Sequence, residues 1–360
     1  MSRPIHALID LSALEHNLSV VRQHAPNSRI MAIIKANAYG HGLLHTAKAL
    51  RQADGFAMLE PHAAISLRQA GYQHPILLLE GFFSMTELAL FKQYKLTAVI
   101  HHKEQLSMLS ASEEGELDVF IKINTGMNRL GFAPEEFLPA LHSLEANPTI
   151  KQISLMTHFA DADDLAKASS VNNQLQCFNT LTKGLNYPRS LANSAAIMHY
   201  PETHVDWIRP GLLLYGASPS SEKTAKALDL RPAMTISSKL IATQNLKIGD
   251  RVGYGGRFQA SRSMRIGIVA GGYADGYPRH AFTGTPVLIN NQRTHTIGLV
   301  SMDMLAIDLS YIENAQCGST VILWGKGLPV EEIAHAAGTI SYELLCAMAP
   351  RVESIIQDDN

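Results

Sequence analysis

Short apolar runs alternate with amphipathic segments along the first two thirds of the chain. Runs of strand length lie at Ile30–Ile34, Phe56–Leu59, Ile76–Leu79, Leu96–Ile100, Val119–Ile123, Ile153–Met156, Ser190–Ala192 and Val205–Ile208. Between most of them, apolar residues recur at helical spacing, at Leu43–Leu50, Ala63–Gln69, Met85–Tyr94, Glu135–Leu144 and Val171–Leu185. Strands that alternate with helices are typical of βαβ units and a parallel sheet. The pattern therefore predicts an α/β fold with an N-terminal (β/α)8 barrel.

One further strand is predicted before the barrel pattern begins. Ile5–Ile9 is a short apolar run, and the turn Asp10-Leu11-Ser12 follows it. Ser12 and Glu15 have the spacing of a capping box, which predicts a helix that starts at Ser12. We expect the strand at residues 5–9 to pair with the C-terminal part of the chain, outside the barrel.

After about Tyr215 the alternation gives way to strands separated by turns. The small, polar stretch Ser218–Lys226 predicts a linker. Strand-like segments follow, with turn signals between them, at Met234–Leu240, Met264–Ala270, Thr285–Ile289, Thr296–Val300, Met304–Leu309 and Thr320–Trp324. One helix is predicted at Val330–Ala337, closed by Gly338. We predict a barrel over residues 1–225 and a mainly β domain over residues 226–360.

Composition excludes several classes of protein. The chain is 46% hydrophobic and 17% charged, so a large core is available, and a net charge of -2 gives no support for nucleic-acid binding. No apolar run reaches the roughly 18 residues of a membrane span, and the N-terminus has no signal-peptide pattern. Cys177, Cys317 and Cys346 are far apart and form no metal or redox spacing, so we expect a reducing, cytoplasmic compartment.

The ends of the predicted barrel strands carry the candidate chemistry. Each run is followed by a polar residue, in chain order Lys35, Glu60, Glu80, His101, Asn124, His158, Asn193 and Arg209. Active sites of such barrels lie at the C-terminal ends of the strands. A lone lysine at a strand end usually just reaches solvent. In a pocket, its neutral amine can form an imine, or Schiff base, with an aldehyde cofactor and can move a proton.

The last two strand ends have the features of a phosphate site. Asn193-Ser194 offers an amide and a hydroxyl at a predicted helix start, although an ordinary helix cap explains the same pair. Arg209-Pro210-Gly211-Leu212 follows the eighth run, and its glycine permits close backbone approach. Barrel enzymes often bind phosphate after strands 7 and 8.

Other candidates have plain structural explanations as well as functional ones. Arg129 lies in a glycine-bounded loop, where it is either a surface residue or a clamp for a carboxylate. Lys122 lies inside an apolar run, where a free ammonium is costly, so it reaches out of the sheet or is modified. His158 at a strand end, and Tyr254 and Tyr273 in glycine-rich turns, usually just pack.

Eight motifs occur in an order that resembles the alanine racemases, a pyridoxal-phosphate family of the barrel-plus-β-domain type. They are IIKANAYGHG, NTGMNRLGF, THFADAD, ANSAA, RPGLLLYG, GYADGYPR, SMD and TISYE, and they span nearly the whole chain. The resemblance implies that Lys35 holds pyridoxal 5′-phosphate and acts as one catalytic base. It implies that Tyr254 is the other base and comes from the second subunit of a homodimer.

The resemblance also implies the remaining site residues. Cofactor phosphate contacts fall on Tyr39, Asn193, Ser194, Gly211, Leu212 and Tyr342. Arg209 faces the pyridine nitrogen, and His158 links that arginine to the catalytic tyrosine. The substrate contacts and supporting residues fall on Arg129, Met302, Lys122 (often carbamylated in the family), Tyr273, Arg279, Asp163 and Asp303. Leu299 departs from the family, in which this position is commonly arginine, so the usual salt bridges of the substrate entrance are in doubt.

The predicted function is therefore interconversion of L-alanine and D-alanine by two bases, with D-alanine supplied for peptidoglycan or consumed in catabolism. The predicted partners are alanine and a second copy of the chain, without nucleic acid or membrane. Three alternatives stay open: a related barrel decarboxylase, a non-catalytic pyridoxal-phosphate carrier and a racemase of broad amino-acid specificity. The mainly β domain argues against the carrier, because such carriers usually consist of a barrel alone.

Overall fold

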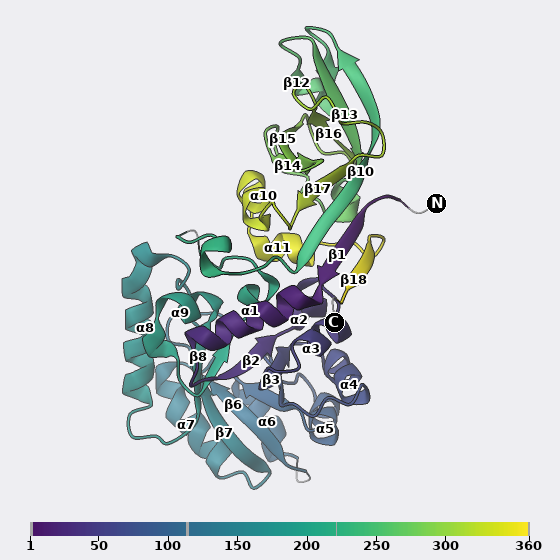
Figure 1. The fold of residues 1–360 in the computed structure, drawn as a ribbon. Coiled ribbons are helices and arrows are strands. Elements are labelled where there is room, and N and C mark those ends of the chain that lie inside the picture. Colours follow the sequence, from purple (N-terminus) through teal and green to yellow (C-terminus); the bar gives the residue numbers. More distant parts are fainter. Residues whose placement is uncertain (1–2, 113–114, 221, 359–360) are drawn as a thin grey trace.

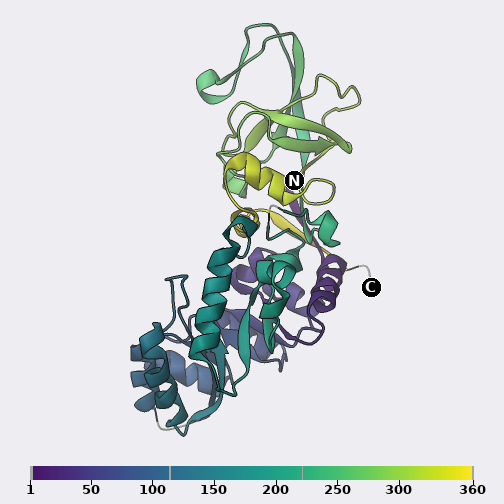
Figure 2. The same cartoon turned by 90° about the vertical axis from the view of Figure 1, so that its left-hand side faces the viewer.

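The computed structural model describes residues 3–112, 115–220 and 222–358, and Figure 1 shows a barrel with a β-sheet domain beyond it. Residue 221 of the predicted linker lies outside the described residues, as do residues 1–2 and 359–360 at the ends of the two predicted domains. The molecule is elongated in both views (Figures 1 and 2).

Among the described residues, eight parallel strands close into a barrel in chain order, which confirms the predicted fold class. These strands are β2 Arg29–Ile33, β3 Gly55–Met58, β4 Ile76–Leu78, β5 Thr97–Ile100, β6 Leu117–Lys122, β7 Ile150–Met156, β8 Arg189–Asn193 and β9 Trp207–Arg209. The two weakest apolar runs form β8 and β9. β9 closes the barrel, because it pairs with β8 on one side and with β2 on the other. Residues of β3, β4 and β5 are buried throughout, as expected for strands covered by helices.

Helices surround the barrel in the described residues (Figure 1). They are α1 Leu11–His24, α2 Lys35–Tyr39, α3 Leu43–Ala49, α4 Pro61–Gln69, α5 Met85–Gln93, α6 Lys103–Ser110, α7 Pro134–Glu145, α8 Ala168–Leu181 and α9 Ser194–His199. Short 3-10 helices follow or connect them, namely η1 Leu165–Lys167, η2 Pro201–Thr203, η3 Leu212–Tyr215 and η4 Lys226–Leu228. The sequence pattern did not predict α6, because it buries only a glutamine and a leucine, Gln105 and Leu109.

The predicted start of the first helix is wrong by one residue, and the predicted cap is wrong. α1 begins at Leu11, and the carboxylate of Asp10 accepts the backbone N–H of Ala13 at 3.0 Å. The hydroxyl of Ser12 donates to that same carboxylate at 2.7 Å, so Ser12 supports the cap instead of forming it. An aspartate is at least as good a cap as a serine, and here it comes first.

The β domain is built on an eight-stranded sheet in the order β13-β16-β15-β14-β17-β10-β1-β18 among the described residues. Its strands are β1 His6–Asp10, β10 Met234–Leu246, β13 Met264–Ala270, β14 Pro286–Ile289, β15 Gln292–Ile297, β16 Met304–Asp308, β17 Thr320–Trp324 and β18 Glu353–Gln357. A small hairpin, β11 Arg251–Val252 and β12 Phe258–Gln259, extends from it, with 3-10 helices η5 Tyr254–Gly256 and η6 Tyr273–Asp275. β1 lies between β10, to which it is antiparallel, and β18, to which it is parallel.

β15 begins four residues earlier than the sequence pattern indicated. Asn290 and Asn291 both have positive φ, 48° and 62°, and form a two-residue hairpin turn between β14 and β15. The first half of β15 is polar and largely exposed, so it carried no apolar signal. The predicted helix at Val330–Ala337 is α10, and Gly338 closes it with φ of 66°.

α11, Ser341–Cys346, brings the β domain against the mouth of the barrel. Gly40 follows α2 with φ of 79°, and a Cβ at this position would overlap the carbonyl oxygen of Leu345. The two segments therefore approach backbone to backbone, which only glycine permits. No helix in the part of the chain that the structure describes has both the length and the apolar composition to cross a membrane.

Candidate active site

Lys35 lies after the C-terminal end of β2, at the start of a left-handed turn. Ala36, Asn37 and Ala38 have φ of 52°, 51° and 55°, and Tyr39 has φ of 50°. These residues form a left-handed helical turn, which costs L-residues about 1–2 kcal/mol each. Backbone strain of this kind concentrates at functional sites. The turn therefore marks the segment around Lys35 as a candidate site by geometry alone.

His41 stabilises this turn from within the core. It is 1% exposed, and its Nδ1 lies 2.9 Å from the carbonyl oxygen of Tyr39 and 3.1 Å from that of Ala38. Burial lowers the pKa of His41 to about 4, so the ring is neutral at physiological pH and its Nδ1–H donates to these carbonyls.

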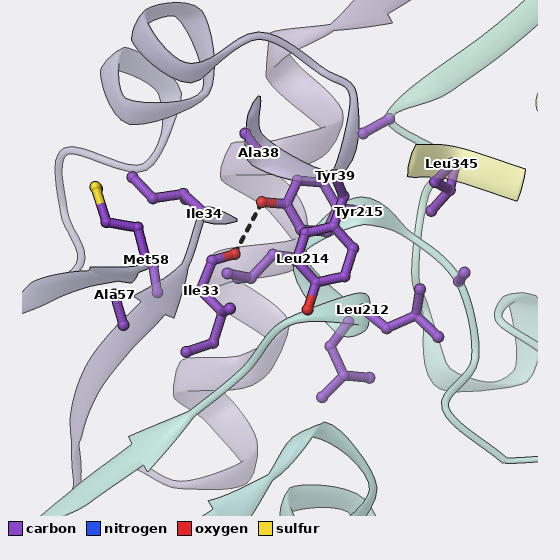
Figure 3. Close-up of a cluster of buried hydrophobic side chains, with 14 of the residues drawn as sticks. Ile33, Ile34, Ala38, Tyr39, Ala57, Met58, Leu212, Leu214, Tyr215 and Leu345 are labelled. Carbon is purple, nitrogen blue, oxygen red and sulfur yellow. Dashed lines mark hydrogen bonds between the residues drawn. The ribbon is translucent and has the colours of Figure 1, made fainter. Parts of the chain in front are cut away.

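Tyr39 packs against two other tyrosines. Its ring stacks on Tyr215 with centroids 4.6 Å apart (Figure 3), and the ring centroid of Tyr342 in α11 lies 5.9 Å from that of Tyr39. The Tyr215 hydroxyl donates to the carbonyl oxygen of Ile33 at 2.8 Å, which ties this stack to β2. Burial raises the pKa of Tyr39 well above its usual value, and burial together with Asp163 raises the pKa of Tyr342 to about 12. Both hydroxyls are therefore donors at neutral pH.

Polar groups after β8 and β9 converge beside Tyr39. The Ser194 hydroxyl accepts the N–H of Gly211 at 2.8 Å. A Cβ at Gly211 would lie 2.7 Å from the Tyr39 hydroxyl oxygen, so glycine leaves the space that brings this hydroxyl to the backbone. Among the described residues, the N–H of Leu212 has no acceptor. Asn193 caps α9 by accepting the N–H of Ala196 at 3.0 Å. These hydroxyl and N–H donors could hold a phosphate.

Arg209 crosses the barrel interior from β9 and is 4% exposed. Its guanidinium donates to the Ser190 hydroxyl at 2.7 Å, to the Thr157 carbonyl at 2.7 Å and to the Leu191 carbonyl at 3.2 Å. It forms no salt bridge in the described residues. Burial lowers its pKa to about 10, which still leaves it cationic at neutral pH.

His158 follows β7 and lies against Arg209. Its Nδ1 is 3.3 Å from Nη2 of the guanidinium, and a guanidinium can only donate, so Nδ1 is the acceptor. Burial, then the charges of Arg209, Lys122, Arg129 and Lys35, holds the pKa of His158 well below its usual range. The ring is therefore neutral and carries its proton on Nε2.

Lys122 and Arg129 complete a cationic barrel mouth. Lys122 is 7% exposed, and burial, then Arg209, Arg129 and Lys35, lowers its pKa to about 8. Arg129 is exposed, in the loop after β6. Burial, followed by the charge of Arg129, lowers the pKa of the Lys35 amine. Both effects favour the neutral form of the amine, in an environment that attracts anions.

The structure does not bring every candidate residue to this mouth. Tyr254 is 75% exposed in η5, beside β12, at the end of the β domain far from the barrel (Figure 1). Met302 and Arg279 lie on loops of the β domain, and Tyr273 begins η6 of that domain. Asp163 lies in the loop after β7, close enough to Tyr342 to affect its pKa.

Asp303 and a buried neighbour connect the Met302 loop to the chain ends. The Asp303 carboxylate accepts from Arg351 at 2.6 Å, and Arg351 also donates to Asp275 at 2.7 Å. Asp275 is 1% exposed and also accepts from Arg3 at 2.9 Å. Sequence reasoning did not single out Asp275, although it stands within the GYADGYPR motif.

The arrangement fits pyridoxal phosphate on structural grounds. The cradle beside Gly211 offers donors for a phosphate, and burial lowers the pKa of the Lys35 amine. Arg209 is a buried donor beside a neutral histidine. A closed parallel barrel with such groups at the C-terminal ends of its strands, followed by a mainly β domain, defines a barrel-type enzyme.

Two family models match the chain and identify the family. The alanine racemase N-terminal domain matches residues 9–219, and the alanine racemase C-terminal domain matches residues 233–356. The chain therefore belongs to the alanine racemase family of isomerases.

Individual relatives agree over their full length. The alanine racemase of Nitrosospira multiformis is 61% identical over 356 residues, covering 99% of this chain and 100% of that protein. A Salmonella typhimurium protein named alanine racemase, catabolic, is 49% identical over 98% of this chain and 99% of its own length. The crystal structure of biosynthetic alanine racemase from Pseudomonas aeruginosa is similar with a TM-score of 0.96 at 43% identity, covering 99% of this chain and 100% of that chain.

Proposed function

We propose that this protein interconverts L-alanine and D-alanine with pyridoxal 5′-phosphate bound to Lys35, and with Tyr254 of the partner subunit as a second base. The observation that carries the proposal is the position of Lys35 at the barrel mouth, in the strained turn that also places Tyr39 against Gly211. Burial lowers the pKa of the Lys35 amine, which favours its neutral form. When bound, the cofactor supplies an electron sink that makes the Cα proton of an attached amino acid acidic.

The cradle residues hold the cofactor phosphate in this proposal. Tyr39 and Tyr342 donate through their hydroxyls, which burial keeps protonated. Ser194, Asn193, Gly211 and the backbone N–H of Leu212 supply the remaining contacts.

Arg209 would face the pyridine nitrogen of the bound cofactor. A guanidinium has hydrogen-bond donors and no acceptor, so it would keep that nitrogen unprotonated. The weaker electron sink would limit side reactions such as transamination. His158 orients Arg209 through Nδ1 and presents Nε2–H to Tyr254 of the partner subunit.

Two bases on opposite faces explain racemisation. A single fixed base returns the proton to the face from which it came. Lys35 removes the Cα proton of D-alanine through Nζ, and Tyr254 removes that of L-alanine through its phenolate oxygen. The half that Lys35 performs requires a neutral amine, which burial and Arg129 favour.

Arg129 binds the substrate carboxylate, with the Met302 amide of the partner subunit as a second contact. Carbamylation of Lys122 would replace a buried cation among cations by an anion that pairs with Arg129, which relieves the cost of burial. Tyr273, Arg279 and Asp163 border the substrate entrance, where Leu299 stands in place of the family's usual arginine.

A homodimer follows from the proposal, because the β11–β12 hairpin that carries Tyr254 lies at the end of the β domain far from the barrel strand β2 (Figure 1). A cytoplasmic location is supported by the free thiols of Cys177, Cys317 and Cys346. Both a catabolic relative and a biosynthetic one are similar to this chain, so supply of D-alanine for peptidoglycan and alanine catabolism both fit the proposal.

Racemisation by the purified holoenzyme, followed in each direction by chiral chromatography, tests the proposal. Lys35→Ala should abolish racemisation in both directions. Tyr254→Phe should reduce it by about 10²–10⁴-fold, because it removes the acid–base group. Tyr311→Phe, at another highly exposed tyrosine of the β domain, is the matched control. Wild-type racemisation rates in both Lys35→Ala and Tyr254→Phe would contradict the proposal. So would borohydride trapping of the cofactor on a peptide without Lys35.

A further inference from the structure

A single buried side chain connects the loops that follow β6 and β7. Gln174 of α8 is 3% exposed. Its Oε1 accepts the N–H of Ala160 at 2.9 Å, and its Nε2 donates to the His158 carbonyl at 3.1 Å and to the Thr125 hydroxyl at 3.2 Å. Both amide hydrogens and the amide oxygen are therefore used, and they span two loops.

The Thr125 end of this connection continues to Arg209. The hydroxyls of Thr125 and Thr157 are 2.7 Å apart, and the Thr157 hydroxyl donates to the Ile123 carbonyl at 3.0 Å. The Thr157 hydroxyl has one hydrogen, and the Ile123 carbonyl accepts it. The Thr125 hydroxyl therefore donates to Thr157 and accepts from Gln174. The carbonyl of Thr157 in turn accepts from Arg209 at 2.7 Å.

Hydrogen bonds to the Asn124 side chain tie together the loop that begins at Thr125. The side-chain oxygen of Asn124 accepts the N–H groups of Gly126 and Asn128, at 3.2 and 3.0 Å. Gly126 packs directly on the glutamine, since a Cβ there would lie 3.2 Å from Cγ of Gln174. A shift at Thr125 or Gly126 is therefore carried to Arg129, a few residues further along.

We propose that Gln174 is a positioning residue that sets where the Arg129 loop lies relative to the His158–Arg209 pair. The inference rests on the proposed function, in which Arg129 binds the substrate carboxylate. Loss of the glutamine amide releases both loops from a common anchor, so the carboxylate clamp moves away from the cofactor. Substrate and transition state both use this clamp, so KM for alanine rises more than kcat falls.

The test compares holoenzyme variants in both directions of racemisation, with thermal stability and the cofactor absorption spectrum measured alongside. Gln174→Met keeps the length of the side chain and removes its three hydrogen bonds. Thr125→Val removes one hydroxyl from the same connection, and Thr125→Ser keeps it. Gln105→Met is the matched control. That glutamine is 4% exposed and bridges the loops after β4 and β5, with bonds to the Glu80 carbonyl at 3.1 Å and the His101 N–H at 2.8 Å.

We expect Gln174→Met and Thr125→Val to raise KM by about tenfold, since small misplacements of a positioning group are costly. Thr125→Ser and Gln105→Met should keep KM within about twofold of wild type, even if Gln105→Met lowers the melting temperature. A wild-type KM in Gln174→Met overturns the inference, as does an equal rise in Gln105→Met. If Gln174→Met does not fold, the Thr125→Val and Thr125→Ser pair decides, and equal KM values in the two overturn it. Absence of racemisation in the wild-type holoenzyme contradicts the proposed function itself and is seen before any variant is compared.

Discussion

At the scale of single residues, the barrel mouth is organised by buried positive charge. Arg209 and Lys122 are almost fully buried, and Lys35 and His158 are partly so. Each cation makes it harder for its neighbours to bind a proton. The result is that the two groups able to exchange protons, an amine and an imidazole, are driven toward their neutral forms. An anionic cofactor or substrate is attracted to the same place.

This charge arrangement predicts a pH effect at Lys35. The nearby guanidinium of Arg129 contributes to the lowered pKa of the Lys35 amine, after burial. Arg129→Gln removes that charge, so the pKa of Lys35 should rise and its neutral fraction at pH 7–8 should fall. Competitive acetylation of the cofactor-free chain across pH, with Lys35 read by peptide mass spectrometry, measures the midpoint. It should move to higher pH in Arg129→Gln and stay in place in Arg51→Gln, at an exposed arginine outside the site. A midpoint that falls or does not move contradicts this electrostatic account.

At the scale of elements, the segment from Lys35 to Tyr39 is a left-handed turn that no propensity favours. Asparagine tolerates this conformation better than most residues, and the carbonyl contacts of His41 help to hold the turn. The turn directs Lys35 and Tyr39, at its two ends, into the same mouth. A right-handed helix after β2 would give Lys35 and Tyr39 a different spacing and direction. The strained turn is therefore part of the geometry of the site.

The corrected cap of α1 gives a second prediction. Asp10→Ala should lower the free energy of unfolding by about 1 kcal/mol, within a usual range of 0.5–2 kcal/mol for lost caps. Ser12→Ala removes a hydroxyl that only supports the cap, so it should cost less than about 0.5 kcal/mol. Urea denaturation of the two variants measures both values. An equal or larger loss in Ser12→Ala would show that the serine is the true cap.

At the scale of the whole molecule, the proposed site is divided between the barrel and the β domain. The barrel carries most of the residues proposed to hold the cofactor, and α11 of the β domain brings Tyr342 beside Tyr39. The hairpin that carries Tyr254 extends away from the barrel (Figure 1). Only a second copy of the chain can bring that tyrosine to a mouth in the proposed mechanism.

Subunit mixing tests this division. Lys35→Ala and Tyr254→Phe chains are each expected to be nearly inactive. In a mixed dimer, one site combines the intact lysine of one chain with the intact tyrosine of the other. Random exchange makes half of the dimers mixed, each with one of two sites restored, so activity should return to about a quarter of wild type. Chiral chromatography before and after exchange measures it. No recovery, in the presence of mixed dimers detected by native mass spectrometry, contradicts shared sites.

The sequence by itself determined the architecture of the barrel and the identity of most candidate residues. Hydrophobic period and turn chemistry are local, so they indicated β2 to β9 even where β8 and β9 were weak. Family motifs carried Lys35, Arg129 and Tyr254 without any geometry. Local reading failed where two signals overlapped, as at Asp10 and Ser12, or where a strand is polar and exposed, as in β15.

Only the tertiary structure decided how the strand ends meet. Barrel closure brings Arg209 against His158 and sets Lys122 among three other cations, and neither contact follows from spacing along the chain. No sequence motif identifies Gln174, because its proposed role depends on hydrogen bonds to residues 14 to 49 positions away. The separation between Tyr254 and the barrel of its own chain likewise depends on the position of the β domain relative to the barrel. Contacts between distant segments depend on the closed fold, whereas periodicity reports only what each segment buries.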